Sequence, residues 1–251
     1  MLSAYLLVSH GSHDPRPEIA MQHLAGLLSR KVQSYLSGMA NSFAGCSYEK
    51  SLIGTAYLEL NSEPLHEQVK RFGNNAVALG CRSLKILPLF LLPGVHVMED
   101  IPAEISQAEQ SLDENIKIHI QPYLGSHPGL GALLAKQLAP SYAGAKILLA
   151  HGSRRPGSQQ AVEAIAASLG AVAAYWTHPS SLKSRVQELV IAGYCQIAIL
   201  PYFLFTGGIT DAIALQQEEL KLLFPGVSFQ LAEPLGASAE LADVIWELME
   251  K

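Results

Sequence analysis

Short apolar runs alternate with amphipathic stretches along the whole chain. The apolar runs contain few polar positions, which is typical of strands covered on both faces in a parallel α/β sheet. We expect strands at 4–9, 51–58, 84–91, 117–122, 145–150, 171–176, 196–204 and 227–232. We expect helices at 16–36, 63–80, 99–112, 127–138, 157–169, 179–193, 211–224 and 236–250. Each half therefore alternates strand and helix, which predicts a small parallel sheet with right-handed crossovers and helices on both faces.

The second half of the chain repeats the first. Three pairs of segments match in the same order: 4–12 with 145–153, 56–58 with 174–176, and 86–91 with 199–204. The first pair ends in His-Gly-Ser in both copies, at His10 and His151. Several matches in the same order indicate a duplicated domain. We therefore expect two tandem domains, residues 1–140 and 141–251, each of a usual domain size.

The two copies differ at their polar positions. Aligning the repeats places Glu59 opposite Thr177 and His96 opposite Ile209. The first copy has therefore kept potential metal ligands that the second copy lacks. This asymmetry indicates that the functional site lies in the first half. A Gly/Ser-rich stretch at 37–47 has no counterpart in the second half, and we expect it to be a surface excursion.

Composition excludes several classes of protein. Apolar residues make up 49% of the 251 residues and charged residues 16%, which is typical of well-buried sheets. The net charge of −5 comes without basic blocks, so we expect no nucleic-acid partner. No apolar run reaches the length of about 18 residues that a membrane span needs, and the N-terminus has no basic stretch typical of a signal peptide. The 3 cysteines form no CxxC pair, which suits a reducing cytoplasm.

Three chemically active side chains follow the first three predicted strands. His10 and Glu59 end the first and second strands, and His96 lies just beyond the third. The carboxyl ends of neighbouring parallel strands border one crevice, so these side chains should converge. Two imidazoles and a carboxylate suit a divalent first-row metal, and they can also accept protons. We therefore predict a catalytic metal site of His10, Glu59 and His96, with Gly11 and Gly94 allowing close approach of the backbone to a ligand.

Several motifs resemble those of a known family, the class II chelatases, and in particular the sirohydrochlorin chelatases of siroheme and cobalamin biosynthesis. The second half is similar to the C-terminal half of the two-domain members. The resemblance covers almost the whole chain except the excursion. Its motifs lie at 10–17, 56–60 and 87–96 in the first half, and at 151–154 and 201–208 in the second.

This resemblance implies a lyase that inserts Fe²⁺ or Co²⁺ into a tetrapyrrole without ATP, in a cleft between two α/β domains. It also implies that His10 and His96 are the catalytic metal-binding histidines and Glu59 an accompanying carboxylate. The chain lacks the His-rich segment and the C-terminal cysteine motif of some cobalt-specific long members, which favours iron. His151 keeps its motif without a second histidine partner, so we do not assign it to the metal. The metal ion is the substrate, and we expect no further cofactor.

The same resemblance makes sirohydrochlorin the expected partner. Sirohydrochlorin is a polycarboxylate, so a chain of net charge −5 needs local positive charge or backbone donors beside it. The two His-Gly-Ser loops are followed by arginines that are suitably placed, including Arg155 in the second loop. The residues that we expect to contact the substrate are Ser12, Arg16, Gly94, His151, Ser153 and Arg154.

Three other functions are weighed against metal insertion. A non-catalytic carrier of a tetrapyrrole or a metal would use the same residues, and this alternative stays open. A histidine phosphatase normally needs an arginine beside its nucleophilic histidine, but Ser9 and Ala150 stand there. A serine hydrolase is disfavoured because neither His-Gly-Ser lies in a G-x-S-x-G motif. Since an internal duplication can replace a homodimer of single domains, we expect a monomer.

Overall fold

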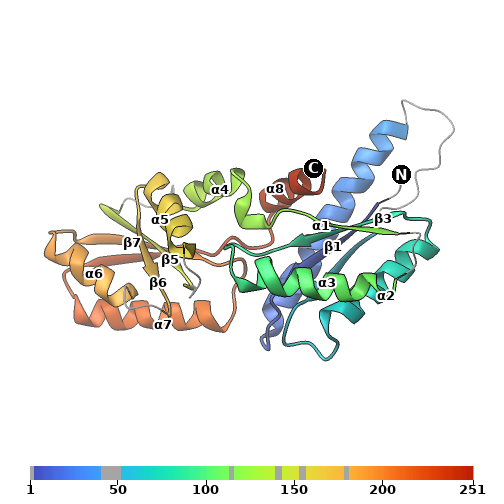
Figure 1. Cartoon of the computed structure of the whole chain (residues 1–251). Helices are drawn as coiled ribbons and strands as arrows, with labels where there is room; N and C mark the ends of the chain where they lie inside the picture. Colours follow the sequence, from blue (N-terminus) through green and yellow to red (C-terminus); the bar gives the residue numbers. More distant parts are fainter. Residues whose placement is uncertain are drawn as a thin grey trace. The chain divides into compact units, whose positions relative to one another are not determined.

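The fold is given by a computed structural model, which describes residues 3–40, 52–112, 116–138, 143–152, 157–177 and 181–250 (Figure 1). The strands are β1 (Ser3–Ser9), β2 (Ile53–Tyr57), β3 (Ser83–Pro88), β4 (Lys117–Ile120), β5 (Ala145–Ala150), β6 (Val172–Tyr175), β7 (Gln196–Tyr202) and β8 (Ser228–Leu231). The helices are α1 (Pro15–Ala40), α2 (Leu65–Ala78), α3 (Ile101–Glu109), α4 (Gly129–Leu138), α5 (Ser158–Ser168), α6 (Leu182–Ile191), α7 (Gly208–Leu223) and α8 (Ala239–Met249). A π-helical turn, η1 (His96–Asp100), precedes α3, and a 3₁₀ turn, η2 (Leu124–Ser126), precedes α4. The predicted alternation of strands and helices is confirmed.

The strands form two four-stranded sheets, and every pairing in them is parallel. The strand orders are β2-β1-β3-β4 and β6-β5-β7-β8, so each half of the chain builds the same topology. In the first sheet, β1 is flanked by β2 and β3, with Val8 in register with Ala56 on one side and with Pro88 on the other. The carboxyl ends of these three strands therefore lie at one edge of the sheet. The residues that follow them are brought close together by this register.

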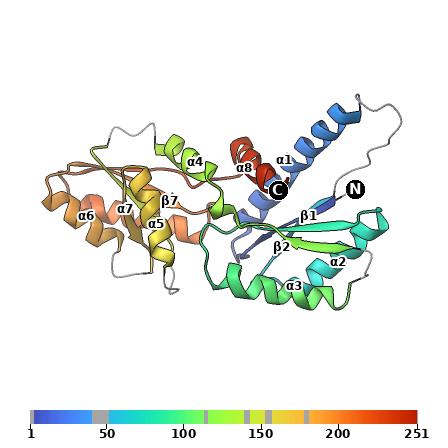
Figure 2. The same ribbon diagram turned by 45° about the horizontal axis from the view of Figure 1, so that its top comes forward.

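The first sheet is covered by helices on both faces, which explains the nearly uniform apolar sequence of its central strand. Leu6, Leu7 and Val8 of β1 are at most 1% exposed. Helices α2 and α3 cover one face, where their apolar residues join Leu6 and Val8 in one core cluster (Figures 1 and 2). Helices α1 and α8 pack against the other face. The predicted two-sided burial is confirmed in this unit.

The second sheet is covered in the same way. Ile147, Leu148 and Leu149 of its central strand β5 are completely buried. Helices α6 and α7 contribute Val186 and Ile213 to the core cluster on one face, and α4 and α5 contact the strands of this sheet as well. The duplication seen in the sequence is thus a duplication of the fold.

The compact units of the fold do not coincide with the two repeats. One unit comprises Met1–Phe90, Val95–His127 and Ala237–Lys251, and the other comprises Leu91–Gly94 and Pro128–Gly236. Helix α8 therefore belongs to the first unit although it ends the second repeat, and α4 belongs to the second unit although it ends the first repeat. The predicted domain division, 1–140 and 141–251, describes the sequence repeat, whereas the packing of these two helices follows a different division.

Helix α8 is held in the first unit by an apolar face and by polar contacts at its edges. Its Leu241, Ile245 and Leu248 are buried. Asp243 forms an ion pair with Lys31 of α1. The ring of Trp246 contacts the ring of Tyr35, also in α1, at a centroid distance of 5.5 Å. These contacts join residues that are far apart in the sequence.

Two further predictions concern the excursion at 37–47 and membrane-spanning helices. The excursion predicted at 37–47 begins inside α1, which continues to Ala40, and residues 41–47 lie outside the described part of the chain. Among the residues that the structure describes, no helix has both the length and the hydropathy that crossing a bilayer requires.

Candidate metal centre

The predicted ligands of the first half stand at one edge of the first sheet. His10 directly follows β1, Glu59 lies two residues beyond β2, and His96 is the first residue of η1 after β3. Strand pairing continues past the ends of β1 and β2, because the Glu59 amide N–H donates to the His10 carbonyl oxygen over 2.8 Å. This hydrogen bond fixes the backbone of Glu59 beside that of His10. The local fold thus places a carboxylate between two imidazoles.

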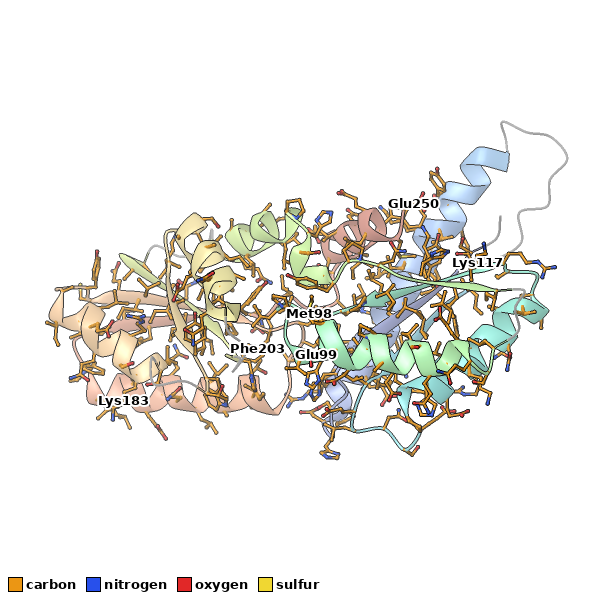
Figure 3. The ribbon with its side chains drawn as sticks, viewed as in Figure 1. Met98, Glu99, Lys117, Lys183, Phe203 and Glu250 are labelled. Atoms are coloured by element: carbon orange, nitrogen blue, oxygen red, sulfur yellow. The ribbon has the colours of Figure 1, made fainter. Side chains whose placement is uncertain are left out.

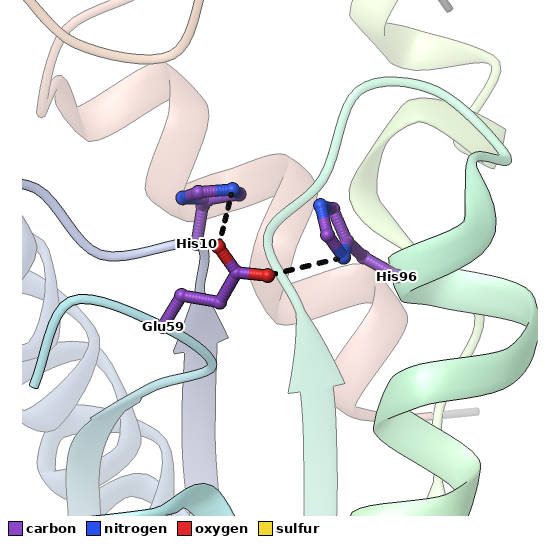
Figure 4. Close-up of side chains that lie close together, drawn as sticks. All are labelled: His10, Glu59 and His96. Carbon is purple, nitrogen blue, oxygen red and sulfur yellow. Dashed lines mark ion pairs between the residues drawn. The ribbon is translucent and has the colours of Figure 1, made fainter. Parts of the chain in front are cut away.

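The three side chains point toward one another (Figure 4). One Glu59 carboxylate oxygen lies 3.5 Å from His10 Nε2, and the other lies 4.0 Å from His96 Nδ1. The two imidazole rings meet edge to face with their centroids 5.0 Å apart. One ligand atom from each of the three residues lies within 4.8 Å of the other two. The structure therefore brings together the three residues that the sequence selected.

This arrangement suits an ion that must be taken up and then released. Nitrogen and oxygen ligands of this kind bind divalent first-row metals. The side chains of His10, Glu59 and His96 are 46%, 49% and 35% exposed, so a bound ion stays accessible to a second molecule. A closed structural site would instead surround its ion with protein ligands. The geometry is that of an open site, and the binding of metal by these residues stays a prediction.

A glycine next to His10 makes the close approach of Glu59 possible. Gly11 has a φ of +98°, which side-chain-bearing residues rarely adopt. A Cβ atom at this position would lie 2.0 Å from the Glu59 carbonyl oxygen. The expected role of Gly11 in allowing close approach thus has a physical cause here, although its partner is the backbone of Glu59.

We expect Gly11→Ala to destabilise the fold and to displace Glu59. The backbone conformation alone costs about 1–3 kcal/mol for a residue with a side chain, and the contact with Glu59 adds to this. Thermal unfolding followed by circular dichroism should show a lower melting temperature. As a control, Gly26→Ala in the interior of α1 places its Cβ 3.8 Å from Arg30 and should stabilise the protein by roughly 0.5–1 kcal/mol. Equal melting temperatures for the two variants would contradict the proposed role of Gly11.

The backbone directly after Glu59 is also unusual. Leu60 has a φ of +55° and is the one non-glycine residue with positive φ noted among the described residues. Such conformations are uncommon for residues with side chains and concentrate at functional sites. The Leu60 side chain is exposed, as are those of Val95 and Met98 beside His96 in the sequence. No sequence signal indicated Leu60.

A fourth polar side chain, which the sequence reasoning missed, contacts one of the ligands. Asp100 Oδ2 lies 2.7 Å from His96 Nδ1. The two residues are four apart at the two ends of η1. That spacing was a signal available in the sequence, but an ordinary helical pair of this kind is too common to be singled out.

The second repeat has the same backbone arrangement without the ligand set. His151 is exposed, and its ring lies 6.5 Å from that of Phe203. The Thr177 amide N–H donates to the His151 carbonyl oxygen over 3.1 Å, as Glu59 does to His10, and the Thr177 hydroxyl donates to the same oxygen over 2.8 Å. Within the described ranges, the three-residue cluster of the first repeat is the one group found with metal-ligand geometry.

The expected substrate contacts of the first repeat are placed as follows. The Ser12 hydroxyl accepts a hydrogen bond from the Asp14 amide over 3.0 Å, and the Arg16 guanidinium binds the Asp14 carboxylate. This guanidinium lowers the pKa of Asp14 to about 2, so the pair is ionised at neutral pH. The Gly94 amide donates to the Leu92 carbonyl oxygen over 2.8 Å in a tight turn. Two further predicted contacts, Ser153 and Arg154, lie outside the described residues.

Comparison with known proteins shows the family to which this duplicated α/β fold belongs. The family model CbiX matches residues 4–141 and again residues 145–251. The chain belongs to the CbiX family. The two successive matches also agree with the duplication seen in the sequence.

Individual relatives are distant but extend over the whole chain. The sirohydrochlorin cobaltochelatase of Priestia megaterium is 23% identical over 266 residues, which cover 100% of this chain and 80% of that protein. SirB from Bacillus subtilis with Fe³⁺ has a TM-score of 0.73 at 22% identity, covering 100% of this chain and 95% of SirB. The sirohydrochlorin chelatase SirB of Bacillus subtilis subspecies spizizenii in complex with cobalt has a TM-score of 0.71 at 20% identity, covering 100% and 94%. At these identities, the solved structures support the shared fold.

Proposed function

We propose that this protein is a chelatase that inserts a divalent metal ion into sirohydrochlorin without ATP. The observation that carries the proposal is the cluster of His10, Glu59 and His96, which is exposed and lies in one repeat of a duplicated fold. Membership of the CbiX family and the names of the relatives support the substrate. The product would serve siroheme or cobalamin biosynthesis.

The ligands have two tasks in this reaction. The ion must lose part of its hydration shell, and two pyrrole N–H protons must leave the macrocycle. Neutral imidazoles of His10 and His96 replace water on the ion while leaving coordination positions free for the pyrrole nitrogens. As the pyrrole nitrogens take over the ion, the Glu59 carboxylate or an imidazole accepts the released protons. Glu59 lies within 4.0 Å of both histidines, so the group that accepts a proton is next to the groups that bind the ion.

The surroundings of the ligands suit a large ring with acidic substituents. The exposed apolar side chains of Leu60, Val95 and Met98 belong to the same two segments as Glu59 and His96. Apolar surface of this kind can contact the face of a macrocycle. Arg16 is the nearest arginine in sequence to His10, and we propose that it exchanges part of its contact with Asp14 for a substrate carboxylate. His151 would contribute a contact to the same substrate.

We propose Fe²⁺ as the favoured metal, with Co²⁺ as a second substrate. Similar solved structures include SirB from Bacillus subtilis with Fe³⁺ and SirB from Bacillus subtilis subspecies spizizenii in complex with cobalt. Imidazole and carboxylate ligands bind both ions, so cellular supply contributes to the choice. The metal is consumed as a substrate, and we propose no additional cofactor. We further propose that the chain acts as a monomer, because the duplication supplies both domains within one chain.

An insertion assay tests the function directly. Purified full-length protein is mixed under anaerobic conditions with excess sirohydrochlorin and with Fe²⁺, Co²⁺ or Ni²⁺ in parallel, and the loss of the metal-free absorption spectrum is followed. We expect many turnovers per protein molecule, fastest with Fe²⁺. The uncatalysed rate without protein is the control.

The same assay separates the competing functions. A carrier would bind sirohydrochlorin or metal in a one-to-one ratio and would not exceed one equivalent of product. A histidine phosphatase would hydrolyse a generic aryl phosphate, and we expect no such activity. Stoichiometric binding without turnover would contradict the chelatase proposal.

A further inference from the structure

The segment that carries His96 has an uncommon backbone. Residues His96–Asp100 form the π-helical turn η1, and the Ile101 amide donates to the His96 carbonyl oxygen, five residues earlier. Such turns are rare and occur frequently at functional sites. Side chains four residues apart lie on the same face of a helical turn, and here the Asp100 carboxylate lies beside the His96 ring.

The contact between these two residues determines which His96 nitrogen is available to a metal. Asp100 Oδ2 lies 2.7 Å from His96 Nδ1, within the range of a strong hydrogen bond. Glu59 Oε1 lies 4.0 Å from the same nitrogen, which is too long for a hydrogen bond. Since an ionised carboxylate can only accept, Nδ1 carries the proton and donates it to Asp100. The lone pair of His96 is then on Nε2, where it can bind an ion.

Asp100 acts on the site through His96. The group of ligand atoms that approach within 4.8 Å of one another comprises His10, Glu59 and His96, and among the described residues it does not include Asp100. Metal-binding histidines usually donate their second ring N–H to a carboxylate, a carbonyl or water, which fixes the ring orientation and makes the ligand more basic. The position of Asp100 fits this role.

The second repeat provides an internal comparison. With Pro88 aligned to Pro201, His96 corresponds to Ile209 and Asp100 corresponds to Ile213. Ile213 is completely buried, and the equivalent segment is the start of the regular α-helix α7. The histidine, the carboxylate and the π-turn are therefore present together in one repeat and absent together from the described part of the other. The fold of the repeat does not need Asp100, which leaves a role at the site.

We propose that Asp100 is a positioning residue of the metal centre. It accepts the Nδ1 proton of His96, holds the imidazole in the Nδ1–H tautomer and directs Nε2 toward the ion shared with His10 and Glu59. Both residues belong to the π-turn η1. The proposal rests on the proposed function for the identity of the metal as a substrate, but the binding of the metal alone tests it separately.

The test compares three variants of the full-length protein. Asp100→Ala removes the acceptor, and Asp100→Asn keeps an amide oxygen in its place. Glu99→Gln is the matched control, because it removes one negative charge from an exposed neighbour in the same turn (Figure 3). Thermal unfolding confirms that each variant is folded. Titration with Co²⁺ alone, followed by its visible absorption, then gives the dissociation constant.

We expect Asp100→Ala to raise the Co²⁺ dissociation constant about 10- to 100-fold, which is usual for the loss of such a partner. Asp100→Asn should cause a smaller increase, because its amide oxygen still accepts the Nδ1 proton. Glu99→Gln should stay within about twofold of the original protein. The two Asp100 variants should slow Co²⁺ insertion in the same order.

A second readout reports on the tautomer, which a purely structural role of Asp100 would not change. In protein labelled with ¹⁵N-histidine and free of metal, two-bond ¹H–¹⁵N correlation spectra distinguish a protonated Nδ1 from a protonated Nε2, and a His96→Gln variant assigns the signals. We expect the Nδ1–H form in the original protein and in Asp100→Asn, and a mixture in Asp100→Ala.

Two results are decisive against the positioning role. A folded Asp100→Ala variant with an unchanged Co²⁺ dissociation constant would overturn it, and so would an unchanged tautomer of His96. Failure of the proposed function has a different signature, because the original protein would then bind Co²⁺ and show the expected dependence on Asp100 without catalysing insertion.

Discussion

His10→Ala and His96→Ala are each expected to slow metal insertion at least about tenfold, which corresponds to about 1.4 kcal/mol of activation free energy. His151→Ala should cause a clearly smaller loss. The reason is the asymmetry of the repeats. His10 and His96 share Glu59, whereas the position equivalent to Glu59 in the second repeat is Thr177, whose hydroxyl binds the His151 carbonyl oxygen.

Initial rates of insertion at saturating sirohydrochlorin, measured over a range of metal concentrations, check this prediction. The His151→Ala variant is the matched control, because it removes the same side chain from the same motif in the other repeat. All three histidines are partly or largely exposed, so the substitutions should leave the melting temperature nearly unchanged. Equal losses of activity in the three variants would show that both repeats contribute metal ligands, contrary to the assignment made here.

Glu59→Gln is expected to reduce the insertion rate by roughly 10- to 100-fold, about 1.4 to 2.8 kcal/mol of activation free energy. The amide keeps the size of the side chain but loses the negative charge that binds the ion or accepts a pyrrole proton. The side chain is 49% exposed, and the hydrogen bond that fixes its backbone comes from the amide N–H. The fold should therefore be retained, with a change in stability below about 0.5 kcal/mol.

A control variant separates the local effect of Glu59 from the change in overall charge. Glu109→Gln removes an equal charge from an exposed position at the end of α3, away from the ligand cluster in sequence. Its insertion rate should match that of the original protein. Wild-type turnover in Glu59→Gln would remove Glu59 from the site and leave the two histidines as the ligands to be tested.

The local pattern of the sequence determined the alternation of strands and helices in each repeat. Continuous apolar runs such as Leu6, Leu7 and Val8 predicted a buried parallel strand, and the structure buries all three. The predicted strand at 145–150 has the same bounds as β5. Prediction succeeds here because strand and helix formation depend on periodicity and on turn residues that are close together in the chain.

The sequence also determined which residues converge at the candidate site. His10, Glu59 and His96 follow three successive strands, and in a parallel sheet with β1 between β2 and β3 such residues meet at one edge. The duplication sharpened this choice, because it showed which copy had kept the ligands. The order of the strands in the sheet, which brings the three residues side by side, is seen in the tertiary structure.

Tertiary structure alone decided that α8, which ends the second repeat, belongs to the first compact unit, and that α4, which ends the first repeat, belongs to the second. The apolar faces of both helices are evident in the sequence, but an apolar face does not specify the sheet against which it packs. The contacts that hold α8, including the ion pair of Asp243 with Lys31, join residues from opposite ends of the chain. A repeat boundary in the sequence therefore does not identify a boundary in packing.

The finer geometry of the site was likewise decided by the tertiary structure. Leu60, with its positive φ, directly follows the residue that pairs with the backbone of His10, and the need for glycine at position 11 follows from the nearby Glu59 carbonyl oxygen. The contact of Asp100 with His96 lies in the π-turn η1, which no periodicity signals. The positions of strands and helices thus follow from local sequence. Backbone conformations at the ligands depend on contacts between segments about 50 residues apart or more, which only the folded chain brings together.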